Sequence, residues 1–224
     1  MSTIAIIGAG PGLGLAIART FGSQGYDVAL ISRSRDKLDG LIDQLASDGI
    51  KAAGFPADVC DRPALTQALN DAAARLGGID VLEYSPAGTA ATTKMTAPSA
   101  TTPTDVQHEI EFQLYGALTA TTAVLPAMRA AGTGTLFYTT GAGSVDPVTM
   151  LGNVNSAAAA LRNWAINLNK ELAGTGVYAV HIGIDVSINV PAFPGAPTAP
   201  AEQIAAAYWD LHTQRAHGEF IYTA

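Results

Sequence analysis

The sequence predicts an α/β fold in which a doubly wound, mostly parallel, seven-stranded sheet carries helices on both faces. Two observations predict it. Short apolar or β-branched runs alternate along the chain with longer segments of helical periodicity, as in a parallel sheet that is covered on both sides. In addition, 48% of the residues are hydrophobic and only 14% are charged, a balance that suits helices packed closely on a buried sheet.

The expected elements follow from this alternation. Strands are expected at residues 4–7, 27–32, 52–56, 79–84, 135–140, 177–184 and 219–222, and helices at 15–23, 36–48, 63–76, 105–131, 154–172 and 201–215. Residues 88–104 are rich in Ala, Thr and Pro, lack periodicity and are expected to form a loop. Residues 188–200 contain four prolines and are expected to form an extended connector.

Length and composition limit the classes of function that the protein can have. A chain of 224 residues suits one domain spanning 1–224, and a formal net charge of −7 with twelve scattered Lys and Arg disfavours nucleic acid and anionic membranes as partners. Cys60 is the sole cysteine, and His108, His181, His212 and His217 lack metal-ligand spacing, so neither a disulfide nor a metal site is expected. The chain shows no signal-type segment and no apolar run of about 20 residues, so we expect a cytoplasmic protein.

A glycine-rich segment, residues 8–14, lies between the first strand and the first helix. Glycines allow close approach of a ligand to the backbone, and a helix N-terminus directs N–H groups at an anion, so the segment suits a phosphate cradle. Leu13 stands where the Gly-x-Gly-x-x-Gly pattern needs glycine, and the spacing that fits is Gly-x-x-x-Gly-x-Gly through Gly8, Gly12 and Gly14. By itself the segment also fits a plain glycine-rich turn.

With this spacing the chain resembles the short-chain dehydrogenase/reductase family along essentially its whole length. Further landmarks occur in the family's order: Asp58-Val59, Pro86-Ala87-Gly88, Gln113-Leu114-Tyr115-Gly116 and Leu125-Pro126-x-Met128. The resemblance implies a Rossmann fold that binds a nicotinamide dinucleotide. The residues it implies for this binding are Gly8, Gly12, Leu13, Gly14, Ser32, Arg33, Asp58, Val59, Ala87, Gly88 and Ser187. It also implies a homodimer or homotetramer paired through the helices at 105–131 and 154–172.

The end of the second strand bears on the choice of cofactor. An acidic residue there would bond the ribose hydroxyls of NAD, but this chain has Ser32-Arg33, with Arg35 and Lys37 close behind. Arg33 can pair with a 2′-phosphate, so NADP(H) is preferred, while NAD(H) stays possible. The alternative is a solvated arginine in a loop.

The resemblance breaks at the catalytic residues. The family uses a Tyr and a Lys four residues apart, with a Ser and an Asn, and an ungapped match of the helix at 154–172 puts Val154 and Ala158 in the Tyr and Lys positions. Gly141 falls on the Ser position and Gln113 on the Asn position. Neither Val nor Ala can donate a proton, and loss of a positioned acid costs roughly 10²- to 10⁴-fold in rate.

Other polar residues are candidate substitutes for the missing acid. They are Thr140, Ser144, Tyr84, Ser85, Lys94, His181 and Asp185, each of which also has a structural or solvated explanation.

Two hypotheses follow. The first is an NADP-dependent oxidoreductase that acts on a carbonyl or alcohol with a rearranged or impaired proton donor. The second is a non-catalytic dinucleotide-binding sensor or interaction protein. The substrate cannot be read from the sequence.

Overall fold

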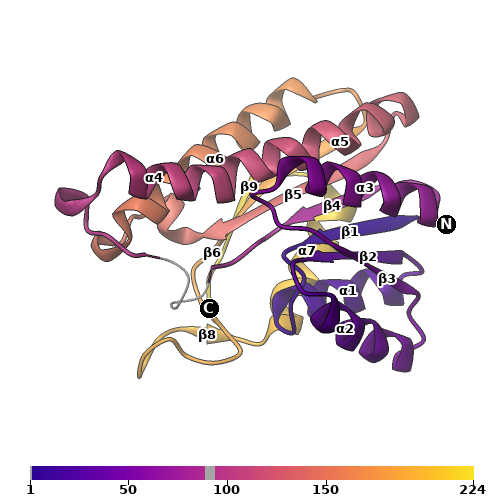
Figure 1. The fold of residues 1–224 in the computed structure, drawn as a ribbon, viewed down its shortest axis with the longest axis horizontal. Coiled ribbons are helices and arrows are strands. Elements are labelled where there is room, and N and C mark those ends of the chain that lie inside the picture. The colour runs from indigo at the N-terminus through magenta and orange to yellow at the C-terminus, as the bar shows by residue number, and fades with distance from the viewer. Residues whose placement is uncertain (1, 89–93) are drawn as a thin grey trace.

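Seven strands form the central sheet of the computed structural model, which describes residues 2–88 and 94–224 (Figure 1). The strand order is β3-β2-β1-β4-β5-β6-β9, and every neighbouring pair is parallel. The bounds are β1 Thr3–Ile7, β2 Asp27–Ser32, β3 Ala52–Pro56, β4 Val81–Tyr84, β5 Gly134–Gly141, β6 Val177–Ile184 and β9 Glu219–Tyr222. The predicted doubly wound α/β fold is therefore confirmed, and the sheet is parallel throughout.

Helices cover both faces of this sheet. One face carries α1 (Leu13–Ser23), α2 (Arg35–Ser47) and α7 (Ala201–Gln214), and the other carries α3 (Arg62–Leu76), α5 (Gly116–Ala131) and α6 (Gly152–Glu171). The two layers lie on opposite sides of the strands in Figure 1. Within the described residues, none of the helices combines the length and the apolar character that crossing a membrane requires.

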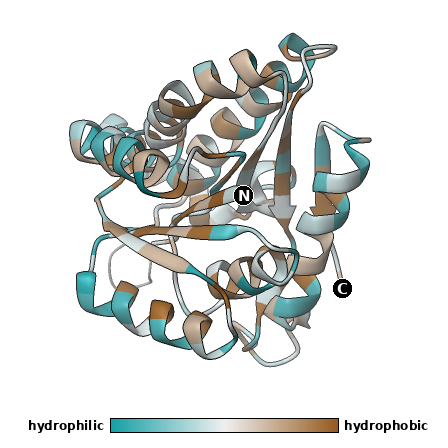
Figure 2. Cartoon of the chain, turned by 90° about the vertical axis from the view of Figure 1, so that its right-hand side faces the viewer, coloured by the Kyte–Doolittle hydropathy of each residue, from teal (hydrophilic) through white to brown (hydrophobic). Residues whose placement is uncertain are grey.

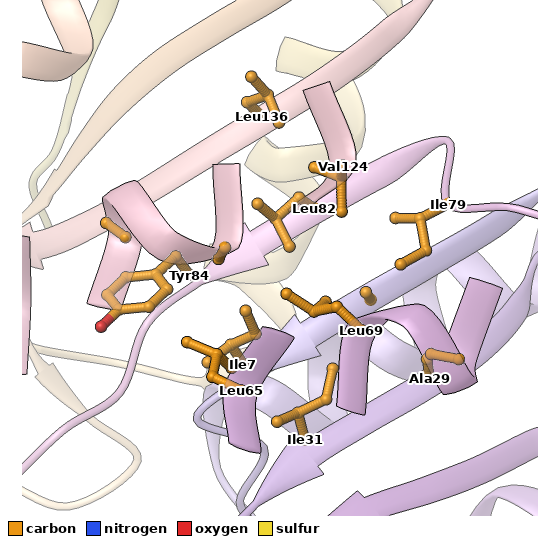
Figure 3. Close-up of a cluster of buried hydrophobic side chains, with 14 of the residues drawn as sticks. Ile7, Ala29, Ile31, Leu65, Leu69, Ile79, Leu82, Tyr84, Val124 and Leu136 are labelled. Atoms are coloured by element: carbon orange, nitrogen blue, oxygen red, sulfur yellow. The ribbon is translucent and has the colours of Figure 1, made fainter. Parts of the chain in front are cut away.

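The central strands are mostly apolar because both of their faces are buried. In β1, Ala5 and Ile7 pack in the core under α3, α5 and α6, while Ile4 and Ile6 pack in the core under α1, α2 and α7. Hydrophobic colour runs through the central strands in Figure 2, with polar colour on the outer faces of the helices. The first of these cores is drawn in Figure 3, where side chains of β1, β2 and β4 meet those of the helices above them.

The segment before α5 differs from the expected loop and single long helix. A short 3₁₀ turn, Pro98–Ala100, interrupts the expected loop, and α4 spans Pro103–Ile110. This helix begins earlier than predicted because Thr102 and Asp105 form a capping box and Pro103 occupies the first turn. Between α4 and α5, residues Glu111–Tyr115 form a widened π-helical turn.

A second sheet replaces the extended connector that the prolines suggested. Its strands, β7 Ser187–Ile188 and β8 Thr198–Ala199, are parallel, so the segment folds back on itself. Asn189 has a φ of 63°, a conformation that Asn tolerates, and its side-chain oxygen accepts a hydrogen bond from Ala201 N at 2.8 Å. This bond caps α7, whose adjacent residue Pro200 has no side-chain acceptor.

The Phe21 ring connects α1 with the strands and with α7. It is fully buried, and its centroid lies 5.3 Å from that of Trp209 and 6.2 Å from that of Phe137 in edge-on contacts.

We expect Phe21→Ala to lower the free energy of unfolding by about 3–5 kcal/mol, measured by urea denaturation. Phe193→Ala is the control, because that ring is 64% exposed, and it should change stability by at most about 0.5 kcal/mol. Equal effects of the two substitutions would contradict this assignment of the core.

Candidate functional site

A cavity of about 570 Å³ lies at the carboxyl ends of the strands, where the strand order reverses between β1 and β4. Ligands of open α/β sheets bind at this switch point. The described residues that line it are Gly8, Gly10, Gly12, Leu13, Gly14, Tyr84, Ser85, Pro86, Ala87, Gly88, Met95, Glu109, Phe112, Gln113, Thr139, Thr140, Gly141, Leu151, Val154, Leu161, Ile184, Val186 and Ile188. The cavity therefore joins the glycine segment to the ends of β4, β5 and β6.

The glycine segment has the geometry of a phosphate cradle. Gly8 has a φ of +94°, and a Cβ on it would lie 2.6 Å from the backbone of Pro86, so only glycine lets these two loops meet. A Cβ on Gly12 would meet no protein atom within 4 Å, which means that the space in front of it is open to a ligand. No side chain among the described residues caps α1. Leu15 N donates to Gly10 O at 3.0 Å, which leaves the N–H groups of Leu13 and Gly14 for an anion.

The residues predicted for the adenine end lie beside one another on the same edge of the sheet. Ser32 ends β2, and Asp58 and Val59 follow β3, the strand next to it. Arg33 is exposed, while Asp58 Oδ1 accepts a hydrogen bond from Cys60 N at 3.0 Å and Val59 is buried. None of these four residues lines the main cavity, and their role in binding stays a prediction.

Three of the four residues that the sequence match assigns to the family's catalytic positions line the cavity. Gly141, Val154 and Gln113 do so, whereas Ala158 is buried one turn further along α6 and does not. Gln113 lies in the π-helical turn and donates hydrogen bonds to Val154 O at 3.3 Å and to the buried Glu109 at 3.1 Å. Its amide therefore bridges the turn to α6.

Tyr84 is the only tyrosine among the described lining residues, but it is held in place. Its ring packs in the core with its hydroxyl directed away from the aliphatic side chains (Figure 3), and this hydroxyl donates to Phe112 O at 2.5 Å. Phe112 lies in the π-helical turn. Burial raises the pKa of Tyr84, so it is a poor proton donor.

A buried carboxyl lies directly beneath the cavity. Glu83 in β4 is fully buried and accepts hydrogen bonds from Ser85 Oγ at 2.8 Å and Thr139 Oγ1 at 3.0 Å, both from residues that line the cavity. Thr139 also bonds the hydroxyl of the buried Tyr208 at 2.7 Å. Burial raises the pKa of Glu83 to about 8, so this carboxyl is mostly protonated at neutral pH. A charged residue inside an apolar strand is a sequence signal that our prediction did not use.

A second polar network lies on the opposite face of the sheet, under α6. Thr140 Oγ1 lies 2.8 Å from His181 Nε2, and His181 Nδ1 lies 3.0 Å from Glu219 Oε1. Arg162 of α6 binds both oxygens of Glu219, at 2.5 and 2.9 Å. Burial lowers the pKa of His181 to about 4, while Arg162 lowers that of Glu219, so at neutral pH the ring is uncharged and the carboxyl is ionised.

The structure brings together some of the predicted substitutes and separates others. Thr140, Ser144 and His181 belong to one network, since Ser144 Oγ lies 3.0 Å from Thr140 Oγ1. Sequence reasoning missed Glu219 and Arg162, because no spacing along the chain links β9 and α6 to β5. Asp185 is exposed and lies outside the cavity lining.

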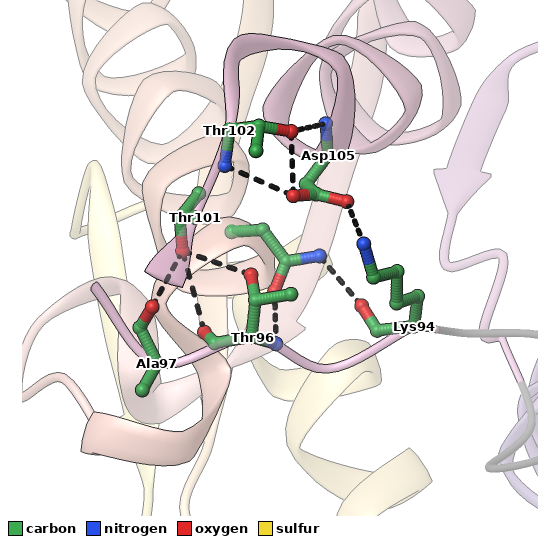
Figure 4. Close-up of polar contacts among 7 residues, drawn as sticks. Lys94, Thr96, Ala97, Thr101, Thr102 and Asp105 are labelled. Atoms are coloured by element: carbon green, nitrogen blue, oxygen red, sulfur yellow. Dashed lines mark hydrogen bonds and ion pairs between the residues drawn. The ribbon is translucent and has the colours of Figure 1, made fainter. Parts of the chain in front are cut away.

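Lys94, a candidate substitute for the missing acid, does not line the cavity. Its ammonium pairs with Asp105 at 2.6 Å, and this bond together with those from Thr102 lowers the pKa of Asp105 to about 2 (Figure 4). Asn153 Nδ2 donates to Lys94 O at 2.7 Å, which ties the segment to α6. Lys94 thus anchors the start of α4 instead of reaching the cavity.

Ser187 is also absent from the cavity lining. Its hydroxyl accepts a hydrogen bond from Ala192 N at 3.0 Å, within the segment between β7 and β8. The neighbours Val186 and Ile188 line the cavity with apolar side chains. Contact of Ser187 with a nicotinamide therefore stays a prediction. Within the described residues no group of three His, Cys, Asp or Glu could hold a metal ion.

These features define a dinucleotide-binding protein of the doubly wound α/β class, and comparisons specify the family. Residues 2–186 match the sequence model of the family described as short chain dehydrogenase. An uncharacterized oxidoreductase of Staphylococcus aureus strain N315 is 32% identical over 183 residues, which are 79% of this chain and 74% of that protein. The chain belongs to the short-chain dehydrogenase family, as the sequence predicted.

Solved structures agree with the fold. The crystal structure of L-sorbose reductase from Gluconobacter frateurii, complexed with NADPH and L-sorbose, superposes with a TM-score of 0.88 at 21% identity, over 99% of this chain and 95% of that one. A variant of actinorhodin polyketide ketoreductase with NADPH also gives a TM-score of 0.88, at 20% identity, over the same shares of the two chains.

Glu83 makes stability depend on pH. Its folded pKa of about 8 lies above the ordinary 4.5, so the folded state keeps a proton that the unfolded chain releases, and stability from this group falls as pH rises from 4.5 to 8. We expect Glu83→Gln to gain stability relative to the wild type across this window, by a few kcal/mol in total, measured by urea denaturation at several pH values.

The control for this measurement is Asp210→Asn on the exposed face of α7, which should track the wild type at every pH. A difference between Glu83→Gln and the wild type that does not change with pH would mean that Glu83 is ionised in the folded protein.

Proposed function

We propose that this protein is an NADP(H)-dependent oxidoreductase that interconverts a carbonyl and an alcohol without the family's tyrosine and lysine. The observation that carries the proposal is the continuity of the cavity, which joins the glycine cradle to hydroxyl groups at the ends of β4 and β5. Family membership supports an oxidoreductase, and the NADPH present in the two reductase structures supports the cofactor.

The residues of this chain suit such a cofactor. The open space at Gly12 and the N–H groups of α1 would hold the pyrophosphate, and Arg33 would pair with the 2′-phosphate of the ribose. When bound, NADP(H) supplies the hydride donor or acceptor, while the protein supplies orientation and the proton. NAD(H) would lack the contact with Arg33.

The walls of the cavity indicate an apolar substrate. Met95, Phe112, Leu151, Val154 and Ile188 surround the space beside the hydroxyl groups. Glu109 is the one charged residue among the described lining residues, so an anionic substrate would find no cation there. We therefore propose an uncharged, largely apolar aldehyde, ketone or alcohol.

The alternative is a non-catalytic sensor or interaction protein that binds NADP(H). It is favoured by one observation, the presence of Val154 at the position where the family holds its proton donor. Both functions require the cofactor, and only the first requires turnover.

Cofactor binding is tested by following the fluorescence of NADPH and NADH on titration with the protein. We expect NADPH to bind at least about tenfold more tightly, and Arg33→Ala to remove most of the difference, because a charge-assisted bond to phosphate contributes about 1.5–3 kcal/mol. Arg75→Ala in the last turn of α3 is the matched control and should bind as the wild type does. Gly12→Val should abolish binding by filling the open space. Failure of both cofactors to bind would overturn both functions.

Catalysis is tested by following NADPH absorbance with apolar aldehydes, ketones and quinones, and NADP⁺ with the matching alcohols. Turnover by the wild type supports the enzyme, and binding without turnover supports the sensor.

The double substitution Val154→Tyr with Ala158→Lys should raise carbonyl reduction by at least about tenfold, because it restores an acid at the cavity wall with a cation one turn behind it on α6. Ala158→Lys alone is the control, since a cation without the phenol supplies no proton to the substrate. No gain in a double variant that still binds NADPH would count against the ungapped match of α6 to the family helix.

A further inference from the structure

The network under α6 connects the cavity to the surface through an unbroken series of hydrogen bonds. Thr140 lines the cavity and is 8% exposed, and His181 behind it is fully buried. Glu219 follows, with a side chain that is 29% exposed. The three side chains come from β5, β6 and β9, which are neighbours in the sheet. His181 is directly opposite Glu219, while Thr140 is two residues beyond the β5 partner of His181 and reaches its ring diagonally.

The partners of His181 determine which ring nitrogen carries the proton. Nδ1 faces the Glu219 carboxylate, so it donates, and Nε2 is left to accept the hydroxyl proton of Thr140. The Thr140 hydroxyl also lies within donating distance of Ser144 Oγ and Gly141 O, each at 3.0 Å, so His181 Nε2 at 2.8 Å has the shortest contact of its three acceptors. When that hydroxyl donates to His181, its oxygen is left to accept from a group in the cavity. In this state Thr140 is backed by a neutral imidazole and a carboxylate, the arrangement that activates a hydroxyl in nucleophile–base–acid triads.

We infer that Thr140, His181 and Glu219 form the proton relay of this enzyme, with Thr140 as the catalytic residue that exchanges a proton with the substrate oxygen. This inference rests on the proposed function. It places the acid–base group one residue before Gly141, on a hydrogen-bonded path that runs beneath α6 and not on α6 itself.

Protons and electrons balance when the relay runs in the direction of alcohol oxidation. The substrate hydroxyl gives its proton to Thr140 Oγ1, and a bound oxidised nicotinamide would supply the acceptor for the hydride. Thr140 passes its own proton to His181 Nε2, Nδ1 releases its proton to Glu219, and Glu219 releases it to solvent. This exchange leaves the proton of His181 on Nε2, so before the next turnover Nε2 returns a proton through Thr140 to water in the open cavity while Nδ1 takes one up through Glu219. Carbonyl reduction runs through the same atoms in reverse, starting from a proton taken up at Glu219.

The charges around His181 favour the proton-accepting state at rest. The charged groups that face it are Glu219 from β9 and, through that carboxylate, Arg162 from α6, while Thr140 and Ser144 are neutral. Arg162 holds Glu219 ionised. The resting relay can therefore accept a proton directly during alcohol oxidation. Carbonyl reduction instead needs one proton from solvent for each turnover.

Kinetics of the variants test the relay with the alcohols and carbonyls of the panel. Thr140→Val should lower kcat by about 10²- to 10⁴-fold, while Thr140→Ser, which keeps the hydroxyl, should stay within about tenfold of the wild type. Alcohol oxidation by the wild type should be independent of pH between about 6 and 8.5, because the relay rests ready to accept. In His181→Gln and Glu219→Gln the rate should instead rise with pH, since hydroxide must replace the relay.

Two measurements separate this role from a structural one. NADPH titration should give unchanged affinity in all four variants, which shows that the cavity is intact. Side-chain ¹⁵N NMR of the wild type should show His181 protonated at Nδ1 only at neutral pH, with the signal identified by its absence from His181→Gln. A ring protonated at Nε2, or at both nitrogens, would overturn the relay.

The competing source of the proton is Glu83, which reaches the cavity through Ser85 and Thr139. Loss of activity in Glu83→Gln with normal activity in Thr140→Val would overturn the relay and leave the proposed function standing. Full activity in Thr140→Val with an unchanged pH profile would do the same. Absence of turnover from the wild type would overturn the enzymatic function and the relay together.

Discussion

Burial of the parallel sheet on both faces is the constraint on which the rest of the structure depends. Each strand must be apolar along its length, because helices remove both of its faces from water. Polar chemistry is thereby confined to the carboxyl ends of the strands, where loops and helix N-termini leave N–H groups free. The cavity lies there, and the glycine segment can approach Pro86 only because Gly8 has no side chain.

Two buried ionisable residues are exceptions to this rule. Glu83 and His181 are both fully buried within strands, on opposite faces of the sheet, and each reaches the cavity through a threonine of β5. A buried ionisable group is costly unless it is neutral or paired. Glu83 meets this condition by holding its proton, and His181 by losing its charge while its ring bonds Glu219 and Thr140. Two buried polar networks therefore reach the cavity, one from each face of the sheet.

Much of the site could be predicted from the sequence, and the features that were not predicted were missed for physical reasons. The spacing of Gly8, Gly12 and Gly14 identified the cradle, and the family match identified Val154 and Ala158 as departures, because both are local patterns. The predicted contact of Ser187 with a nicotinamide stays a prediction, and the sequence did not indicate that its hydroxyl accepts a bond from Ala192 N where the proline-rich segment folds into β7 and β8. The π-helical turn around Gln113 was missed because helical periodicity looks alike on both sides of it. The homodimer or homotetramer expected from the family stays a prediction.

The sequence by itself determined the order of strands and helices and the family, since each depends on patterns of residues close together in the chain, and it predicted the phosphate cradle from the same kind of local pattern. Only the tertiary structure decided which polar groups meet. Thr140, His181 and Glu219 are separated by 41 and 38 positions in sequence and become neighbours through the pairing of β5, β6 and β9. Hydrogen bonds act over about 3 Å and carry no trace in sequence spacing, so these contacts could be seen only in the folded chain.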